Sequence, residues 1–106
     1  MRTRSVIVLE EAARDLDAGM LFYDEIEHGV GLYFIDSLLA DIESLRLFGG
    51  IHREQFGFYR LLSKRFPFAI YYDVMEEYVR VAAILDMRRN PAWIREELLQ
   101  RKSAES

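Results

Sequence analysis

The spacing of the apolar residues changes at Gly57, and this change constrains the fold more than any other feature of the chain. Before Gly57, apolar side chains recur every three or four residues, as on one face of an α-helix. After Gly57 they alternate with a period of two, as in a half-buried β-strand. A chain of 106 residues with both periods predicts one α+β domain. We place this domain at residues 1–102, followed by a frayed tail at 103–106.

The first half of the chain predicts two helices that form an antiparallel hairpin. One helix runs from Glu10 to about Glu27, and the second runs from about Gly31 to Phe48. Asp41 falls off the apolar stripe of the second helix. The residues expected to face the core are Ala13, Leu16, Met20 and Tyr23 in the first helix, and Phe34, Ile35, Leu38, Leu39, Ile42 and Leu45 in the second.

Strands are predicted before and after this hairpin. A short β-branched run at 4–9 predicts the first strand. Three further runs, at 58–63, 66–74 and 78–85, have short links and predict an antiparallel meander. Asn90 and Pro91 open a last helix at 92–102, which Trp93 is expected to anchor to the sheet. The predicted order is β-α-α-β-β-β-α, with the helical hairpin packed on one face of a small antiparallel sheet.

Composition excludes several classes of function. The chain has no Cys, which excludes disulfides, a thiol nucleophile and Cys-based metal sites, and its two His are far apart in sequence. We therefore expect no metal and no cofactor. No apolar run approaches the roughly 20 residues that span a bilayer, and the apolar run near the N-terminus is too short for a signal peptide. These features predict a cytoplasmic protein without a membrane partner.

Charge is unevenly distributed along the chain. The net charge is −4, yet residues 1–50 carry 10 acidic and 4 basic side chains, whereas residues 51–106 carry 8 acidic and 10 basic ones. The acidic total argues against strong nonspecific binding to nucleic acid, because contacts between cations and phosphates dominate such binding. The basic excess of the second half allows two interpretations, solvated strand surfaces or a patch that faces an anionic partner.

Three segments in the observed order resemble the RelE/ParE superfamily of toxins from type II toxin–antitoxin systems. They cover nearly the whole chain. Within the superfamily, they most resemble the ParE-like, plasmid-stabilisation branch. The segments are Phe22-Tyr23 with Gly29-Val30-Gly31-Leu32 and Phe34; Tyr59-Arg60 with the run 64–72; and the run 81–91.

The resemblance implies a toxin that inhibits growth by binding a target such as DNA gyrase and that is neutralised by a cognate antitoxin. Operator DNA would then be reached only through the antitoxin. One alternative is a RelE-like endonuclease that cuts mRNA on the ribosome. Another is a degenerate toxin that retains only antitoxin binding.

Candidate residues for target or phosphate contact are cationic and aromatic. By this resemblance, Arg60 and Arg88 are the residues that best match the phosphate-holding arginines of RelE-type toxins. Arginine suits this role because a guanidinium pairs two phosphate oxygens at once. Arg65 and Arg89 are candidates to reinforce them, and Trp93 is a candidate to stack on a base.

A proton-transfer pair is harder to find. Asp86 follows the last strand where the branch commonly has His-Gly, and it is either a general base or the ion-pair partner of the neighbouring arginines. The sequence therefore favours a binding protein over an enzyme. For the antitoxin, Phe22, Ile26 and Leu39 are candidate docking points, and the acidic surface of residues 10–43 suggests a basic partner segment.

Overall fold

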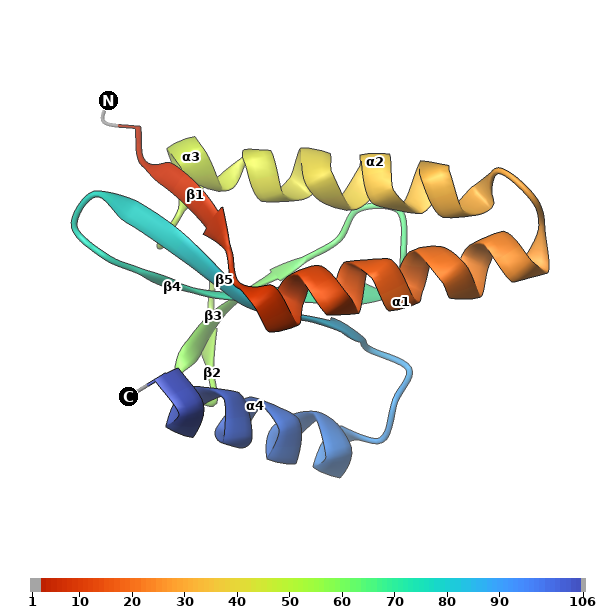
Figure 1. The fold of residues 1–106 in the computed structure, drawn as a ribbon. Coiled ribbons are helices and arrows are strands. Elements are labelled where there is room, and N and C mark those ends of the chain that lie inside the picture. Colours follow the sequence, from red (N-terminus) through yellow and green to blue (C-terminus); the bar gives the residue numbers. More distant parts are fainter. Residues whose placement is uncertain (1–2, 106) are drawn as a thin grey trace.

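The computed structural model describes residues 3–105, so the first two residues of the predicted domain and the last residue of the predicted tail lie outside the described residues. The predicted α+β class is confirmed, with the helices packed on one sheet (Figure 1). Among residues 3–105, no helix is long and apolar enough to cross a lipid bilayer. The elements are β1 (Ser5–Val8), α1 (Glu10–Ile26), α2 (Val30–Glu43), α3 (Leu45–Phe48), β2 (Glu54–Gln55), β3 (Phe58–Leu62), β4 (Phe68–Val74), β5 (Tyr78–Asp86) and α4 (Pro91–Glu105).

The elements differ from the sequence prediction most clearly in three places. The predicted second helix is divided at Ser44 into α2 and the single turn α3. A two-residue strand, β2, adds a further strand to the edge of the sheet beyond β3. Helix α4 includes Pro91 as its first residue and continues past the predicted end at residue 102 to Glu105.

The sheet has the order β1-β5-β4-β3-β2 and is mixed. Strands β3, β4 and β5 form the predicted antiparallel meander, but β1 pairs in parallel with β5, from Ser5 opposite Tyr78 to Val8 opposite Val81. The prediction of a wholly antiparallel sheet was therefore wrong at this edge. A parallel partner needs a long connection, and the chain between β1 and β5, which includes the helical hairpin, supplies it.

Helices cover both faces of the sheet. The hairpin of α1 and α2 packs on one face and α4 on the other (Figure 1). Predicted core positions such as Leu38, Ile42 and Leu45 are buried. Three predictions were wrong: Ala12 rather than Ala13 faces the sheet, Leu39 is exposed, and Asp41 is buried. Asp41 is tolerated inside because its Oδ2 accepts hydrogen bonds from Ser63 Oγ (2.8 Å) and the backbone N–H of Lys64 (3.3 Å).

An irregularity in β5 changes which side chains face each layer. Tyr71 of β4 pairs with Ala83, whereas Tyr72 pairs with Val81, so Ala82 is an extra residue. Val79 and Val81 consequently join the core under the hairpin, while Ala83 and Leu85 join the core under α4. Simple alternation with a period of two would place all four on one face, because it takes no account of a bulge.

Candidate functional site

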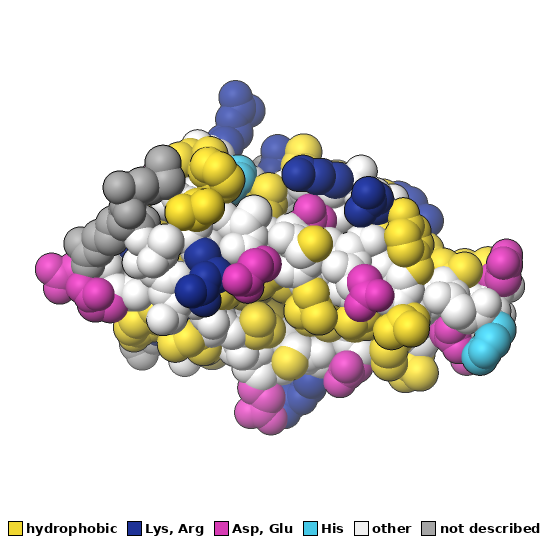
Figure 2. All heavy atoms as spheres, turned by 90° about the horizontal axis from the view of Figure 1, so that it is seen from above, with side chains coloured by type: hydrophobic (Ala, Val, Ile, Leu, Met, Phe, Trp, Pro, Cys, Tyr) yellow, Lys and Arg dark blue, Asp and Glu magenta, His cyan; other side chains and the backbone are white. Residues whose placement is uncertain are grey.

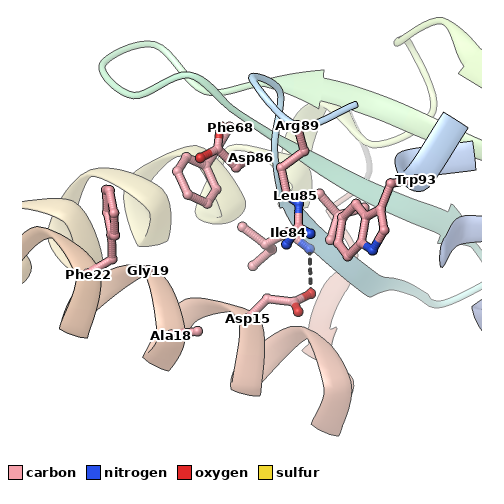
Figure 3. Close-up of a pocket in the computed structure, with 10 residues that line it drawn as sticks. All are labelled: Asp15, Ala18, Gly19, Phe22, Phe68, Ile84, Leu85, Asp86, Arg89 and Trp93. Carbon is pink, nitrogen blue, oxygen red and sulfur yellow. Dashed lines mark hydrogen bonds between the residues drawn. The ribbon is translucent and has the colours of Figure 1, made fainter. Parts of the chain in front are cut away.

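A pocket of about 330 Å³ lies between α1, the end of β5 and the start of α4 (Figure 3). It brings together four of the residues singled out from the sequence, Phe22, Asp86, Arg89 and Trp93. The remaining lining residues are Asp15, Ala18, Gly19, Phe68, Ile84 and Leu85. We call this feature the α1–α4 pocket.

The pocket exists because β1 is shorter than β5. The pairing of β1 ends at Val8 opposite Val81, so the last five residues of β5 pair with β4 on one side but have no strand on the side of β1. Helix α1 takes the place of a strand, since Asp15 Oδ2 accepts a hydrogen bond from the backbone N–H of Ile84 at 2.9 Å (Figure 3). Gly19 lets α1 lie close to α2, because a Cβ at this position would come within 2.6 Å of the Phe34 ring.

Asp86, which lines the pocket, forms an ion pair with Arg88. Arg88 donates from Nε to Asp86 Oδ1 at 2.9 Å and from Nη2 to Asp86 Oδ2 at 2.8 Å, and Nη2 also reaches the hydroxyl of Tyr23 at 3.2 Å. The hydrogen bonds from Arg88 hold the pKa of Asp86 below its usual value, and the same pair raises the pKa of Arg88. Both carboxylate oxygens of Asp86 are thus hydrogen-bonded to Arg88. The lowered pKa makes Asp86 a weak general base at neutral pH.

A second cation lines the pocket in a different way. The guanidinium carbon of Arg89 lies 3.6 Å from the centre of the Trp93 ring. Trp93 is only partly buried, and it packs against the core under α4 from the side. Ile94 and Leu98, which are buried one helical turn apart, are the principal anchors of α4. Their spacing of four residues was the sequence signal for this role, and the sequence reasoning overlooked it.

No protein-family model matches the chain, and no curated protein matches it in sequence. A solved structure described as "Chromosomal ParDE TA system from P. aeruginosa" contains a chain of similar structure. The TM-score is 0.70 at 21% sequence identity, over 77% of this chain and 94% of that chain. The two chains share one fold.

Arg60 lies outside the α1–α4 pocket of this ParDE-like fold. Its Nη1 donates to Gln55 Oε1 at 3.0 Å, and its side chain lines a separate pocket with Tyr71, Met87 and Ile94 under the start of α4. Burial raises the pKa of Tyr71, and the nearby Arg60 guanidinium partly offsets this rise. Arg60 and Arg88 therefore contact different elements, and the structure does not bring these two guanidinium groups together around one phosphate position.

The remaining predicted residues are distributed over the surface of the fold. Arg65 is exposed in the link between β3 and β4. Phe22, Ile26 and Leu39 are all exposed, by 49%, 65% and 45%, which leaves their side chains accessible to a partner. Viewed from above, hydrophobic and acidic side chains are interspersed over the helical hairpin (Figure 2).

The sequence reasoning missed a buried cation behind Asp15, one of the residues that line the α1–α4 pocket. Arg101 on α4 is only 8% exposed, binds Asp15 through two nitrogens, and donates to Glu97 and to the carbonyl oxygen of Ala82. Burial alone would lower the pKa of Arg101, but these carboxylates outweigh burial and raise it. Arg101 thereby joins α1, α4 and the bulge of β5. Arg101 and its acceptors therefore meet one another's hydrogen-bonding needs. Among residues 3–105, no cluster suited to a metal ion occurs.

Proposed function

We propose that this chain is the toxin of a type II toxin–antitoxin module, of the ParE-like kind. It inhibits growth by binding a protein target such as DNA gyrase, and a cognate antitoxin neutralises it. The observation that carries this proposal is the fold shared with a chain of a ParDE system over 94% of that chain. The three segments that resemble the RelE/ParE superfamily support the same assignment.

The chemistry of the site favours binding over catalysis. Cutting RNA through a 2′-hydroxyl requires a base, an acid and cations that hold the phosphate. Asp86 is bound to Arg88 through both of its carboxylate oxygens, and Arg60 contacts a different pocket. One observation favours the alternative, a RelE-like endonuclease that acts on the ribosome: Arg60 lies beside the phenol of Tyr71, which pairs a cation with a proton donor.

The antitoxin contact is proposed on the exposed apolar side chains of the helical hairpin. Phe22, Ile26 and Leu39 present exposed apolar side chains there, within the segment 10–43 that carries 10 acidic residues and one basic residue. An amphipathic segment with basic flanks matches such a surface in both hydrophobicity and charge.

Inducible expression in bacteria tests the function directly. We expect growth arrest with an SOS response and chromosomal DNA damage, and relief of both by co-expression of the protein encoded next to this chain. Rapid loss of translation with cut mRNA would instead establish the endonuclease. Normal growth would establish a degenerate toxin, provided that the neighbouring protein still binds in a pull-down.

Cleavage assays with two variants separate the mechanisms further. We expect no ribosome-dependent mRNA cleavage by the wild-type protein. If the wild type does cleave, Arg88→Ala removes a preorganised cation, a loss that typically lowers a rate about 100- to 1000-fold. Asp86→Asn would abolish cleavage only if Asp86 were the general base. Clear wild-type cleavage that both substitutions destroy would contradict the binding mechanism.

A further inference from the structure

We propose that the α1–α4 pocket seats an anchor from a protein partner in which an apolar side chain stands beside a carboxylate. The apolar group fills the floor of the pocket, and the carboxylate binds the edge of the Arg89 guanidinium. This inference goes beyond the proposed function and does not depend on it, since it follows from the shape and charge of the pocket alone.

The floor of the pocket suits an aromatic or long aliphatic group. Phe68, Ile84 and Leu85 are buried beneath it, and the half-exposed Phe22 ring stands at its side (Figure 3). Ala18 on α1 adds no side-chain bulk beyond a methyl group. A volume of about 330 Å³ accommodates such a group, and removing its surface from water supplies the non-directional part of the binding free energy.

The charges lining the pocket select the polar part of the anchor. Both oxygens of Asp86 accept hydrogen bonds from Arg88. Both oxygens of Asp15 are bound by Arg101, and one of them also accepts from the N–H of Ile84. Both oxygens of each of these two carboxylates are therefore already engaged by internal hydrogen-bond donors.

Arg89 is the cation lining the pocket that still offers donors. Among the described residues it forms no ion pair, and its guanidinium stacks on the Trp93 ring. Stacking occupies the face of the guanidinium and restricts its motion, so its N–H edge stays available in one orientation. A planar fork of this kind pairs with a carboxylate through two parallel hydrogen bonds.

The opposite end of the pocket gives the anchor a direction. There Asp15 forms the wall, and behind it Arg101 binds three carboxylates, those of Glu11, Asp15 and Glu97. Negative charge is in excess at this end, which disfavours a second acidic group from the partner. An occupant of the pocket consequently places its carboxylate at the Arg89 end and a neutral or basic group at the Asp15 end.

The single Trp of the chain makes the pocket observable, because Trp93 is a pocket residue. We would titrate the full-length protein with 4-phenylbutyrate, with 4-phenylbutylamine of nearly the same shape, and with inorganic phosphate, and record Trp fluorescence. We expect saturable binding of the carboxylate at about millimolar concentration, as is usual for so small a ligand, and much weaker binding of the amine and phosphate.

Variants assign the carboxylate contact. Arg89→Gln should weaken 4-phenylbutyrate binding about 10- to 100-fold, the range expected for a lost charge-assisted hydrogen bond. Arg95→Gln changes an exposed arginine of α4 that does not line the pocket, and it should leave binding unchanged. Circular dichroism would check that both variants are folded.

Four outcomes would overturn the proposal: no saturable signal with the carboxylate, equal or tighter binding of the amine, tighter binding of phosphate, or unchanged binding in Arg89→Gln. Because the titration uses neither an antitoxin nor a growth assay, failure here leaves the toxin proposal untouched. Failure of the growth assay likewise leaves the pocket chemistry standing.

Discussion

At the scale of single residues, the contact between His52 and Tyr72 couples a buried phenol to a group that titrates near neutral pH. Tyr72 is fully buried, and its oxygen accepts the backbone N–H of Gly50 at 3.0 Å. The single phenolic proton is then available for Nδ1 of His52, which lies within hydrogen-bond distance. Only a neutral imidazole accepts that proton. Burial also lowers the pKa of His52 below 6.5.

This contact predicts a pH dependence of the free energy of unfolding. In the unfolded chain His52 regains a pKa of about 6.5, so between its folded and unfolded pKa values the unfolded state binds more protons. The stabilisation of the folded state that depends on neutral His52 is therefore fully present above about pH 6.5, and it is lost as the pH falls towards the lowered pKa of the folded protein. Urea unfolding at about pH 7.5 and about pH 5.5 should show a smaller loss of stability in His52→Gln than in the wild type.

His28 provides the matched control, because its side chain is fully exposed. We expect His28→Gln to lose as much stability on acidification as the wild type does. A loss in His52→Gln equal to that of the wild type would show that the contact with Tyr72 does not depend on the protonation of His52.

Side-chain contacts were predictable from the sequence only between near neighbours. Asp86 and Arg88 are two residues apart, and their ion pair was one of the two interpretations considered. Asp15 and Arg101 are 86 residues apart, and nothing in their spacing signals that they meet. Their contact depends on the packing of α1 and α4 at one edge of β5, which is a property of the tertiary structure.

At the scale of elements, helix α2 holds the hairpin to the sheet through Ile42, which is 4% exposed. Truncating a buried Ile to Ala typically costs about 2–5 kcal/mol, a large part of the roughly 5–15 kcal/mol that stabilises a domain. Ile42→Ala should therefore clearly lower the urea midpoint. Leu39→Ala is the control on the same helix, where 45% exposure predicts a much smaller change. Equal losses in the two variants would contradict the observed orientation of α2.

Helix α4 is held at its C-terminal part by the ion-pair network of Arg101. Replacing Arg101 by Met keeps the apolar stem but leaves Asp15 without its cation and the carbonyl of Ala82 without that donor. Breaking a buried pair in this way typically costs about 3–5 kcal/mol, whereas the exposed Arg95→Met should change stability by about 0.5 kcal/mol or less. Urea unfolding measures both. A change in Arg101→Met as small as that in Arg95→Met would show that the network contributes little.

The elements themselves were largely predictable, because the period of apolar residues reports which face of a segment is buried. The period fails where the backbone is irregular. The bulge at Ala82 moves Ala83 and Leu85 to the face opposite Val79 and Val81, with no Gly or Pro in the strand to announce it. Asp41 was misplaced for another reason: its burial depends on hydrogen bonds from the β3–β4 link, which lies 22 residues away in the chain.

At the scale of the whole molecule, the order of elements was predictable but the pairing of β1 was not. Short links with turn-forming residues indicate which strands are antiparallel neighbours. The partner of β1 is β5, which follows the hairpin and three further strands in the chain. The same limit applies to the candidate site. Arg60 and Arg88 both come from segments resembling one family, yet Arg60 lies within β3 and Arg88 follows β5, and they contact different elements of the fold.

The separation of charge along the chain predicts how the proposed antitoxin associates with the toxin. Residues 1–50 carry six more acidic than basic side chains, and the hairpin contributes most of them. A basic partner segment would then be steered to the hairpin by long-range attraction, which raises the association rate more than it slows dissociation. The double substitution Asp17→Lys and Glu25→Lys reverses two exposed charges of α1 and should slow association with the neighbouring gene product about tenfold at low salt.

Stopped-flow measurements over a range of ionic strength test this steering. The difference between the double variant and the wild type should shrink as salt increases, because screening shortens the range of the field to about 8 Å at physiological ionic strength. Glu96→Lys on α4 is the control, since it reverses an exposed charge on the element that covers the opposite face of the sheet. An equal slowing by Glu96→Lys, or a difference that persists at high salt, would place the partner elsewhere than on the hairpin.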